Sequence, residues 1–235
     1  MLRSLLALVL LATAASAQPS DTLTVRPGDA SLVTDWMADG TQTLTLKLVQ
    51  PMQQDIGSGT TTYTLSQGRV AKTTVLSIPM QGVTQTDSVT AMAGALAPLT
   101  HTSTGGRAET SLEFLDEGIV GLVTPRTGEA ETVLVMTDAP VFDAAWLTEV
   151  IQSLPFAEGY VAKIPVYSAE MGDEPVDIVV SVVGQETVGE RDGWTVEAAM
   201  GPMTMTHVVD AETRALLVTR LSPQPGVAIE MVPGD

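Results

Sequence analysis

Short runs of alternating polar and apolar residues, separated by turn-forming residues, are the feature that most restricts the fold of this chain. Residues 41–49 read Thr-Gln-Thr-Leu-Thr-Leu-Lys-Leu-Val, so their apolar side chains lie on one face of an extended strand. Similar runs follow with turn residues about every eight to twelve positions, a spacing typical of a β meander, sandwich or barrel. Gly105-Gly106 and Asp192-Gly193 favour tight hairpin turns, because such residues accept positive φ angles. We therefore expect a mainly β protein.

One segment departs from this alternation and follows the period of an α-helix. Its apolar residues form a single stripe when they are placed on a helix: Phe142, Trp146, Leu147, Val150, Ile151 and Leu154. Pro155 prevents the helix from continuing. We expect one amphipathic helix at about 142–154 that covers an open edge or mouth of the sheet, with Trp146 buried.

The first 17 residues have the pattern of a signal peptide. Arg3 precedes the apolar run Leu5 to Ala12, and Ala15-Ser16-Ala17 places small residues where a signal peptidase cuts. The apolar run is shorter than the roughly 20 residues that span a bilayer. We expect cleavage between Ala17 and Gln18, one mainly β domain over residues 18–235 without a transmembrane span, and a periplasmic or secreted location.

The composition argues against several classes of partner and cofactor. The chain has no cysteine, which excludes disulfides and thiolate metal sites. A net charge of −17 repels phosphate backbones, so we expect no nucleic-acid partner. The acidic residues are scattered and form no calcium-binding loop, which favours an acidic surface that aids solubility over a cation site. We expect neither a metal nor a cofactor.

No set of residues has the pattern of a catalytic site. His101 and His207 are the only histidines, and both lie in alternating strands, where we expect them to be solvated. No serine lies in a nucleophile elbow. The acidic residues Glu109, Glu113, Asp116 and Glu117 cluster near one hairpin and leave an acid-dependent hydrolase as an alternative. The chain has few aromatic residues to line a sugar-binding cleft, so we expect a protein that is not an enzyme.

A group of methionines and tryptophans suggests a binding groove. Methionine adapts to varied apolar partners, although it also fills ordinary cores. The candidate groove residues are one in the expected helix and four in late strands: Trp146, Trp194, Met200, Met203 and Met205.

Several phrases, taken in order and spacing, resemble an exported bacterial family known as domain of unknown function 3108. The phrases are Asp87-Ser-Val with Leu96-Ala-Pro-Leu, Ala139-Pro-Val-Phe-Asp143, Ser153-Leu-Pro-Phe with Glu158-Gly-Tyr160, Gly193-Trp-Thr-Val-Glu197, and Val209-Asp-Ala-Glu-Thr-Arg214. The resemblance as a whole covers about Val33 to Val232. The resemblance implies a strongly curved antiparallel sheet, similar in shape to the lipoprotein carriers LolA and LolB, and it implies no catalytic residue. His207 departs from the family pattern, which has an aromatic residue there.

Together these arguments predict a curved, antiparallel, half-barrel-like sheet with one amphipathic helix, at about 142–154, on its concave side. The function that we expect is non-enzymatic binding in the cell envelope, with a lipid, a lipopeptide or an envelope protein as partner. A structural or interaction protein without a small ligand is the alternative, followed by the acid-dependent hydrolase.

The signal-peptide pattern gives a direct test by N-terminal sequencing of the protein isolated from its native source. Because the small residues end at Ala17, we expect the mature chain to begin at Gln18. An intact Met1 in that material would contradict the prediction.

Overall fold

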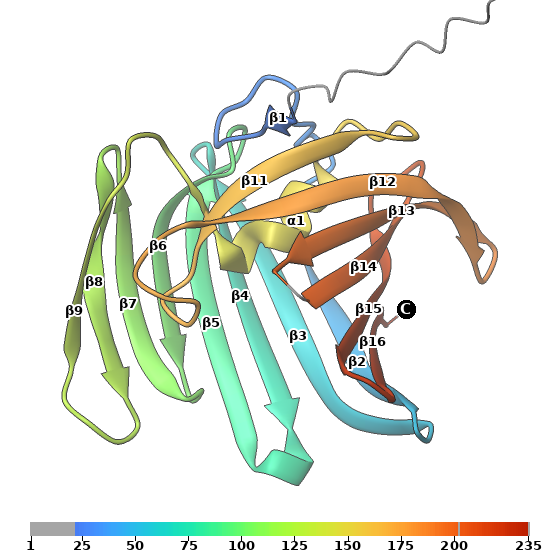
Figure 1. The fold of residues 1–235 in the computed structure, drawn as a ribbon, viewed down its shortest axis with the longest axis horizontal. Helices are drawn as coiled ribbons and strands as arrows, with labels where there is room; N and C mark the ends of the chain where they lie inside the picture. The colour runs from blue at the N-terminus through green and yellow to red at the C-terminus, as the bar shows by residue number, and fades with distance from the viewer. Residues whose placement is uncertain (1–21, 202, 235) are drawn as a thin grey trace, which may run out of the picture.

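The computed structural model describes residues 22–201 and 203–234, which form one large sheet and a short helical segment (Figure 1). The expected signal peptide, residues 1–17, and its cleavage site at Ala17 and Gln18 lie outside the described residues. The strands are β1 (Leu23–Thr24), β2 (Gly40–Gln50), β3 (Gln54–Ser66), β4 (Arg69–Ile78), β5 (Val83–Met92), β6 (Ala97–Thr104), β7 (Ala108–Leu115), β8 (Gly118–Pro125), β9 (Glu131–Met136), β10 (Phe142–Asp143), β11 (Val161–Tyr167), β12 (Val176–Val188), β13 (Arg191–Met200), β14 (Met203–Asp210), β15 (Leu216–Gln224) and β16 (Val227–Pro233).

The sheet consists of two meanders that are joined by the pairing of β16 with β2. Its strand order is β1-β11-β12-β13-β14-β15-β16-β2-β3-β4-β5-β6-β7-β8-β9, and β10 pairs beside β1 on β11. Neighbouring strands are antiparallel, except that β1 and β10 pair with β11 in parallel. The order ends at β9 rather than returning to its start, so the sheet curves without closing. The expected mainly β, half-barrel-like sheet is confirmed.

The helical segment lies on the concave side of the sheet, with β6–β9 on one side of it and β12–β16 on the other (Figure 1). It consists of the 3-10 turn η2 (Ala144–Trp146) and α1 (Leu147–Gln152). A second 3-10 turn, η1 (Pro79–Gln81), lies between β4 and β5. Among the described residues, no helix combines the length and the hydrophobicity that crossing a membrane requires.

The helix is shorter than the expected 142–154 for local reasons at both ends. Phe142 and Asp143 extend to pair with Val166 and Tyr167 of β11, so they form β10. The Asp143 side chain then accepts a hydrogen bond from the Ala145 backbone N–H at 2.9 Å, which caps the segment. At the other end, the Ser153 hydroxyl donates to the Glu149 carbonyl at 2.8 Å, before Pro155 stops the helix.

The main core lies between this helical segment and the concave face. Trp146, Val150 and Ile151 are fully buried there and pack with side chains of β4, β5 and β11–β13. The expected burial of Trp146 against the sheet is therefore confirmed. Because Trp146 is the largest fully buried side chain of this cluster, much of the helix's attachment to the sheet depends on it.

This packing predicts a large loss of stability for Trp146→Ala, about 3–5 kcal/mol, measured by urea unfolding. Leu134→Ala is the control, because Leu134 is 71% exposed and should change stability by only about 0.5 kcal/mol. A loss below about 1 kcal/mol at Trp146 would show that the helix does not depend on this side chain.

Candidate functional site

A row of polar side chains crosses the concave face at the level just below the helix. The strand register pairs its members successively from β3 to β7: Thr61, Thr74, Asp87, Ser103 and Thr110. Directly paired residues of neighbouring strands point to the same face, so these five side chains share one surface. We call this set the polar row. It is unusual because the inner face of a curved sheet is ordinarily apolar.

A second row, one step closer to the helix, contains the charged groups that hold the helix in place. Its members are Tyr63, Lys72, Val89, His101 and Leu112. Lys72 Nζ lies 2.8 Å from Glu149 Oε2, and both side chains are buried. The Tyr63 hydroxyl donates to Glu149 Oε1 at 2.6 Å, and Lys72 also donates to the Ala145 carbonyl. The two oxygens of Glu149 are thus both bound, which is what a buried carboxylate requires.

Two further observations describe the environment of this ion pair. Lys72 Nζ lies 5.0 Å from the centroid of the Trp146 ring, within the range of a cation–π contact. Burial, together with the negative charge of Glu149 beside it, raises the pKa of the Tyr63 hydroxyl above its ordinary value. Tyr63 therefore remains a neutral hydrogen-bond donor at any physiological pH, and the contact with Glu149 persists.

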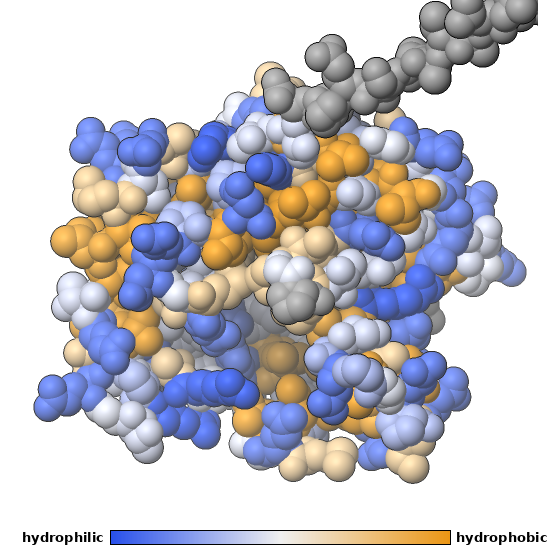
Figure 2. Space-filling view, viewed as in Figure 1, coloured by the Kyte–Doolittle hydropathy of each residue, from blue (hydrophilic) through white to orange (hydrophobic). Residues whose placement is uncertain are grey.

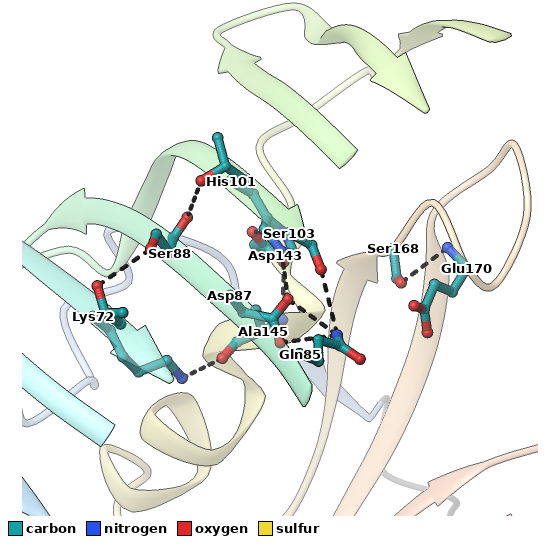
Figure 3. Close-up of polar contacts among 12 residues, drawn as sticks. Lys72, Gln85, Asp87, Ser88, His101, Ser103, Asp143, Ala145, Ser168 and Glu170 are labelled. Carbon is teal, nitrogen blue, oxygen red and sulfur yellow. Dashed lines mark hydrogen bonds and ion pairs between the residues drawn. The ribbon is translucent and has the colours of Figure 1, made fainter. Parts of the chain in front are cut away.

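His101 lies between two carboxylates, one from the sheet and one from the start of the helical segment (Figure 3). Its Nδ1 is 3.0 Å from Asp143 Oδ2, and its Nε2 is 3.8 Å from Asp87 Oδ1. Burial lowers the pKa of His101, but the contacts with Asp143 and Asp87 raise it more, to about 9. His101 is consequently cationic at neutral pH and joins the polar row to the helix cap.

Three adjoining hollows follow the concave face beside the helix. The central hollow, of about 230 Å³, is bounded by part of the polar row, by α1 and by β2, β15 and β16. The side hollow, of about 160 Å³, shares Asp87 and Ala145 with it, and a third hollow, of about 280 Å³, shares Gln42 and Tyr63. Figure 2 shows the molecule hollowed below its centre, with apolar residues at the base. The shared residues indicate one groove in three parts.

The central hollow has walls of different chemistry. One wall consists of the hydroxyls of Thr61 and Thr74 and the carboxylate of Asp87. The facing wall, from β2, β15 and β16, includes four apolar side chains, Leu44, Leu216, Met231 and Pro233, beside the polar residues Gln42, Thr43 and Thr219. The roof includes Glu149, whose charge is already neutralised by Lys72. A hollow of this kind can accept a molecule with one polar and one apolar side.

His207 lies behind the central hollow and is buried, not solvated as the sequence suggested. Its Nδ1 is 3.0 Å from the hydroxyl of Thr219, which lines the hollow, while its Nε2 has no hydrogen-bond partner among the described residues. Burial lowers the pKa of His207 to about 4, so the ring is neutral at physiological pH. The expectation of a solvated His101 is also wrong, because the ion contacts hold that ring inside. Alternation along one strand does not reveal which face curves inward.

The structure distributes the predicted groove residues through the core instead of along these hollows. Trp146 is fully buried, and Trp194, Met200 and Met205 are half-buried and pack against the main core. Met203 is half-buried in β14, paired with Met200 of β13. The Trp194 ring stacks on Phe156 with centroids 6.3 Å apart. None of the five lines the central, side or third hollow, whereas Trp36, which the groove prediction left out, lines the third.

The acidic residues of the hydrolase alternative lie away from the groove. Glu109 and Glu113 are exposed on β7, and Asp116 and Glu117 are exposed in the turn to β8.

Across residues 22–201 and 203–234, no group of three or more potential metal-ligating side chains is close enough to hold a metal ion. The signal for the site lies across strands: polar residues occupy facing positions of β3–β7, and alternation within a single strand does not reveal them.

The low pKa of His207 predicts a specific loss of stability in acid. The unfolded chain takes up a proton at His207 near pH 6.5, whereas the folded protein does so only near pH 4, so stability falls between these values as the pH decreases. The gap corresponds to about 3 kcal/mol. His207→Phe cannot titrate, so its urea-unfolding free energy should fall less between pH 7 and 4.5. Identical pH dependence in both proteins would contradict the assignment.

Comparison with known proteins identifies the family. The family model described as "Protein of unknown function (DUF3108)" matches residues 32–222. The crystal structure of a beta-barrel-like protein of domain of unknown function DUF1849 from Brucella abortus is similar in fold, with a TM-score of 0.56 and 10% sequence identity, over 91% of this chain and 98% of that one. No curated protein matches the sequence. The family model covers most of the chain, which therefore belongs to the DUF3108 family.

Proposed function

We propose that this protein is a non-enzymatic binding protein that holds an amphipathic ligand in the central hollow. The observation that carries the proposal is the difference between the two walls of the hollow, with hydroxyls and a carboxylate facing Leu44, Leu216 and Met231. A purely apolar ligand would cover the polar row without replacing the hydrogen bonds that water makes there. A purely polar ligand would gain nothing from the facing wall. A ligand with both parts satisfies both walls.

The size of the hollow suits a narrow ligand. Its volume of about 230 Å³ is below the range of about 300–1,000 Å³ that is common for ligand pockets. The side hollow adjoins the central hollow at Asp87 and Ala145, so a longer molecule would extend in that direction. A single acyl chain with a polar end fits these dimensions better than a broad ring system.

The side hollow is the better place for the polar end of such a ligand. Its lining includes Asp87, Ser103, Thr110, Ser168 and Glu170, which offer oxygen acceptors and hydroxyl donors. The positive charge of His101 offsets the negative charge of Asp87. The hollow therefore favours a hydrogen-bonding end group over a strongly charged one. Figure 3 shows Asp87 and Ser103 close to Ala145 at the start of the helical segment, with Ser168 and Glu170 on a separate strand and loop.

Two properties of the histidines support binding over catalysis. A general base near pH 7 needs a pKa close to that value and access to the reacting group. His101 is cationic because its pKa is about 9, and its ring contacts two carboxylates. His207 is neutral but lies behind Thr219, with its ring buried. The acids of the hydrolase alternative are exposed and lie outside the groove.

The signal-peptide pattern supports a location in the cell envelope, where lipids and lipopeptides supply amphipathic ligands. The expected likeness to the lipoprotein carriers LolA and LolB agrees with a ligand that contains an acyl chain. The second candidate function, a structural or interaction protein without a small ligand, is favoured by an exposed apolar patch on β7–β9. Both functions accommodate an envelope protein as a partner.

The proposal predicts that dodecanol, or dodecyl maltoside below its micelle concentration, changes the tryptophan fluorescence and raises the melting temperature. Maltose without the chain should do neither. Thr74→Phe places a ring in the central hollow and should weaken binding at least about tenfold, a cost of about 1.4 kcal/mol.

Thr73→Phe is the matched control for this titration. Thr73 neighbours Thr74 on β4, is equally half-buried and also shares a hydroxyl contact across the strands, but it points to the opposite face. The Thr73→Phe variant should bind the dodecyl probes with the same affinity as the wild type. Equal binding by both variants, or no response to any dodecyl probe, would overturn the proposal.

A further inference from the structure

The outer face of the sheet changes character at its last two strands. Across β3–β7 a row of hydroxyl side chains covers this face in register: Thr62, Thr73, Ser88, Thr102 and Ser111. The next residue in the row is Leu122 of β8. The following strand exposes Leu134 by 71% and Met136 by 70%. Figure 2 shows apolar residues gathered on this side of the molecule.

Four exposed side chains form what we call the β9 patch: Leu115, Leu122, Leu134 and Met136. The register places them together, because Leu134 pairs with Val120 while Leu115 and Met136 both pair with Gly118. Exposed apolar groups that cluster in this way usually mark an interaction surface.

The patch lies beside an unprotected strand edge. In the described sheet β9 ends the strand order, so the backbone groups along one of its sides have no neighbouring strand. The opposite end of the sheet differs, because β11 is covered along its edge by both β1 and β10. Proteins ordinarily cover or interrupt such edges, since a free edge can accept a strand from another chain.

The charges around the edge determine which strand it can accept. A hollow of about 360 Å³ borders β9 at Val135 and Met136, and three carboxylates line it: Asp138, Glu174 and Asp177. Two cations accompany these carboxylates, because Arg26 lines the same hollow and Lys163 pairs with one of the three. Arg26 is bound to the Pro140 carbonyl at 3.0 Å, and Lys163 Nζ is 3.9 Å from Asp177.

The remaining surroundings of the patch are also acidic. Glu113 pairs with Val120 on the outer face, and Glu129 and Glu131 precede or begin β9. Arg126, in the loop before β9, donates to the Gly105 carbonyl at 3.0 Å. Antiparallel pairing of two β9 strands would bring the acids of one copy close to those of the other, in a chain whose net charge is −17, which disfavours a second copy as the occupant.

From these features we propose that the β9 edge is a docking site for an extended segment of another protein in which apolar and basic residues alternate. Along β9, Leu134 and Met136 point outward while Val133 and Val135 point inward. An added strand has the same period of two, so its apolar residues cover Leu134 and Met136. Its basic residues then point toward the hollow that contains Asp138, Glu174 and Asp177. This site is separate from the groove and does not depend on the proposed ligand.

The probe for this site is a fluorescein-labelled nine-residue peptide of alternating lysine and valine, with a glutamate–valine peptide as its counterpart. Fluorescence anisotropy should detect binding of the lysine peptide, weakened by added NaCl, and no binding of the glutamate peptide. Hydrogen exchange should slow at the amides of β9 when the lysine peptide is bound, because the edge gains hydrogen-bond partners.

Leu134→Lys should weaken binding of the lysine peptide at least tenfold, because the substitution removes an apolar contact and adds a positive charge that repels the peptide. Met80→Lys is the matched control, since Met80 is 74% exposed in η1, outside the patch, and the peptide should bind this variant normally. Absence of binding, equal affinity for the glutamate peptide, unchanged β9 exchange or unchanged affinity of Leu134→Lys would each overturn the proposal. If the wild type dimerises and Leu134→Lys abolishes the dimer, the proposal is also overturned, because the edge then binds a second copy of this chain.

Discussion

The buried contact between Lys72 on β4 and Glu149 on α1 holds the helix in position, and the groove is defined by that position. A buried ion pair contributes little net stability compared with apolar packing, but loss of one partner leaves an uncompensated charge and costs about 3–5 kcal/mol. Here the pair has additional support from Tyr63, the Ala145 carbonyl and the Trp146 ring. The contact therefore specifies where the helix lies, while Trp146 and its apolar neighbours supply most of the packing energy.

The central hollow is assembled from both meanders of the chain. The polar row belongs to the first meander, whereas Leu216 and Met231 belong to β15 and β16, which reach the first meander through the pairing of β16 with β2. The hollow consequently depends on a contact between residues far apart in sequence. Its position beside a short helix, in a sheet that does not close, leaves it open to solvent, which is what uptake of a ligand requires.

Much of the fold could be predicted from the sequence, because alternation and turn residues act locally. The site could not, since it depends on register between strands and on which face curves inward. Asp192-Gly193 illustrates the difference: the dipeptide suggested a turn but lies inside β13, and the turn falls at Gly189, where φ is 63°. Gly193 serves close packing instead, because a Cβ there would lie 2.7 Å from Val208 Cγ1. Likewise, Trp146, Trp194, Met200 and Met205 pack in or against the main core, whereas residues of the polar row line the central and side hollows.

The central claim is that the groove binds an amphipathic molecule in the cell, and native mass spectrometry of the protein from its own source tests it most directly. The account predicts a bound species that organic solvent releases and that lipid analysis identifies as an acyl-chain compound with a polar end. If the gently isolated protein has the mass of its polypeptide alone and the extract contains no lipid, the account is contradicted.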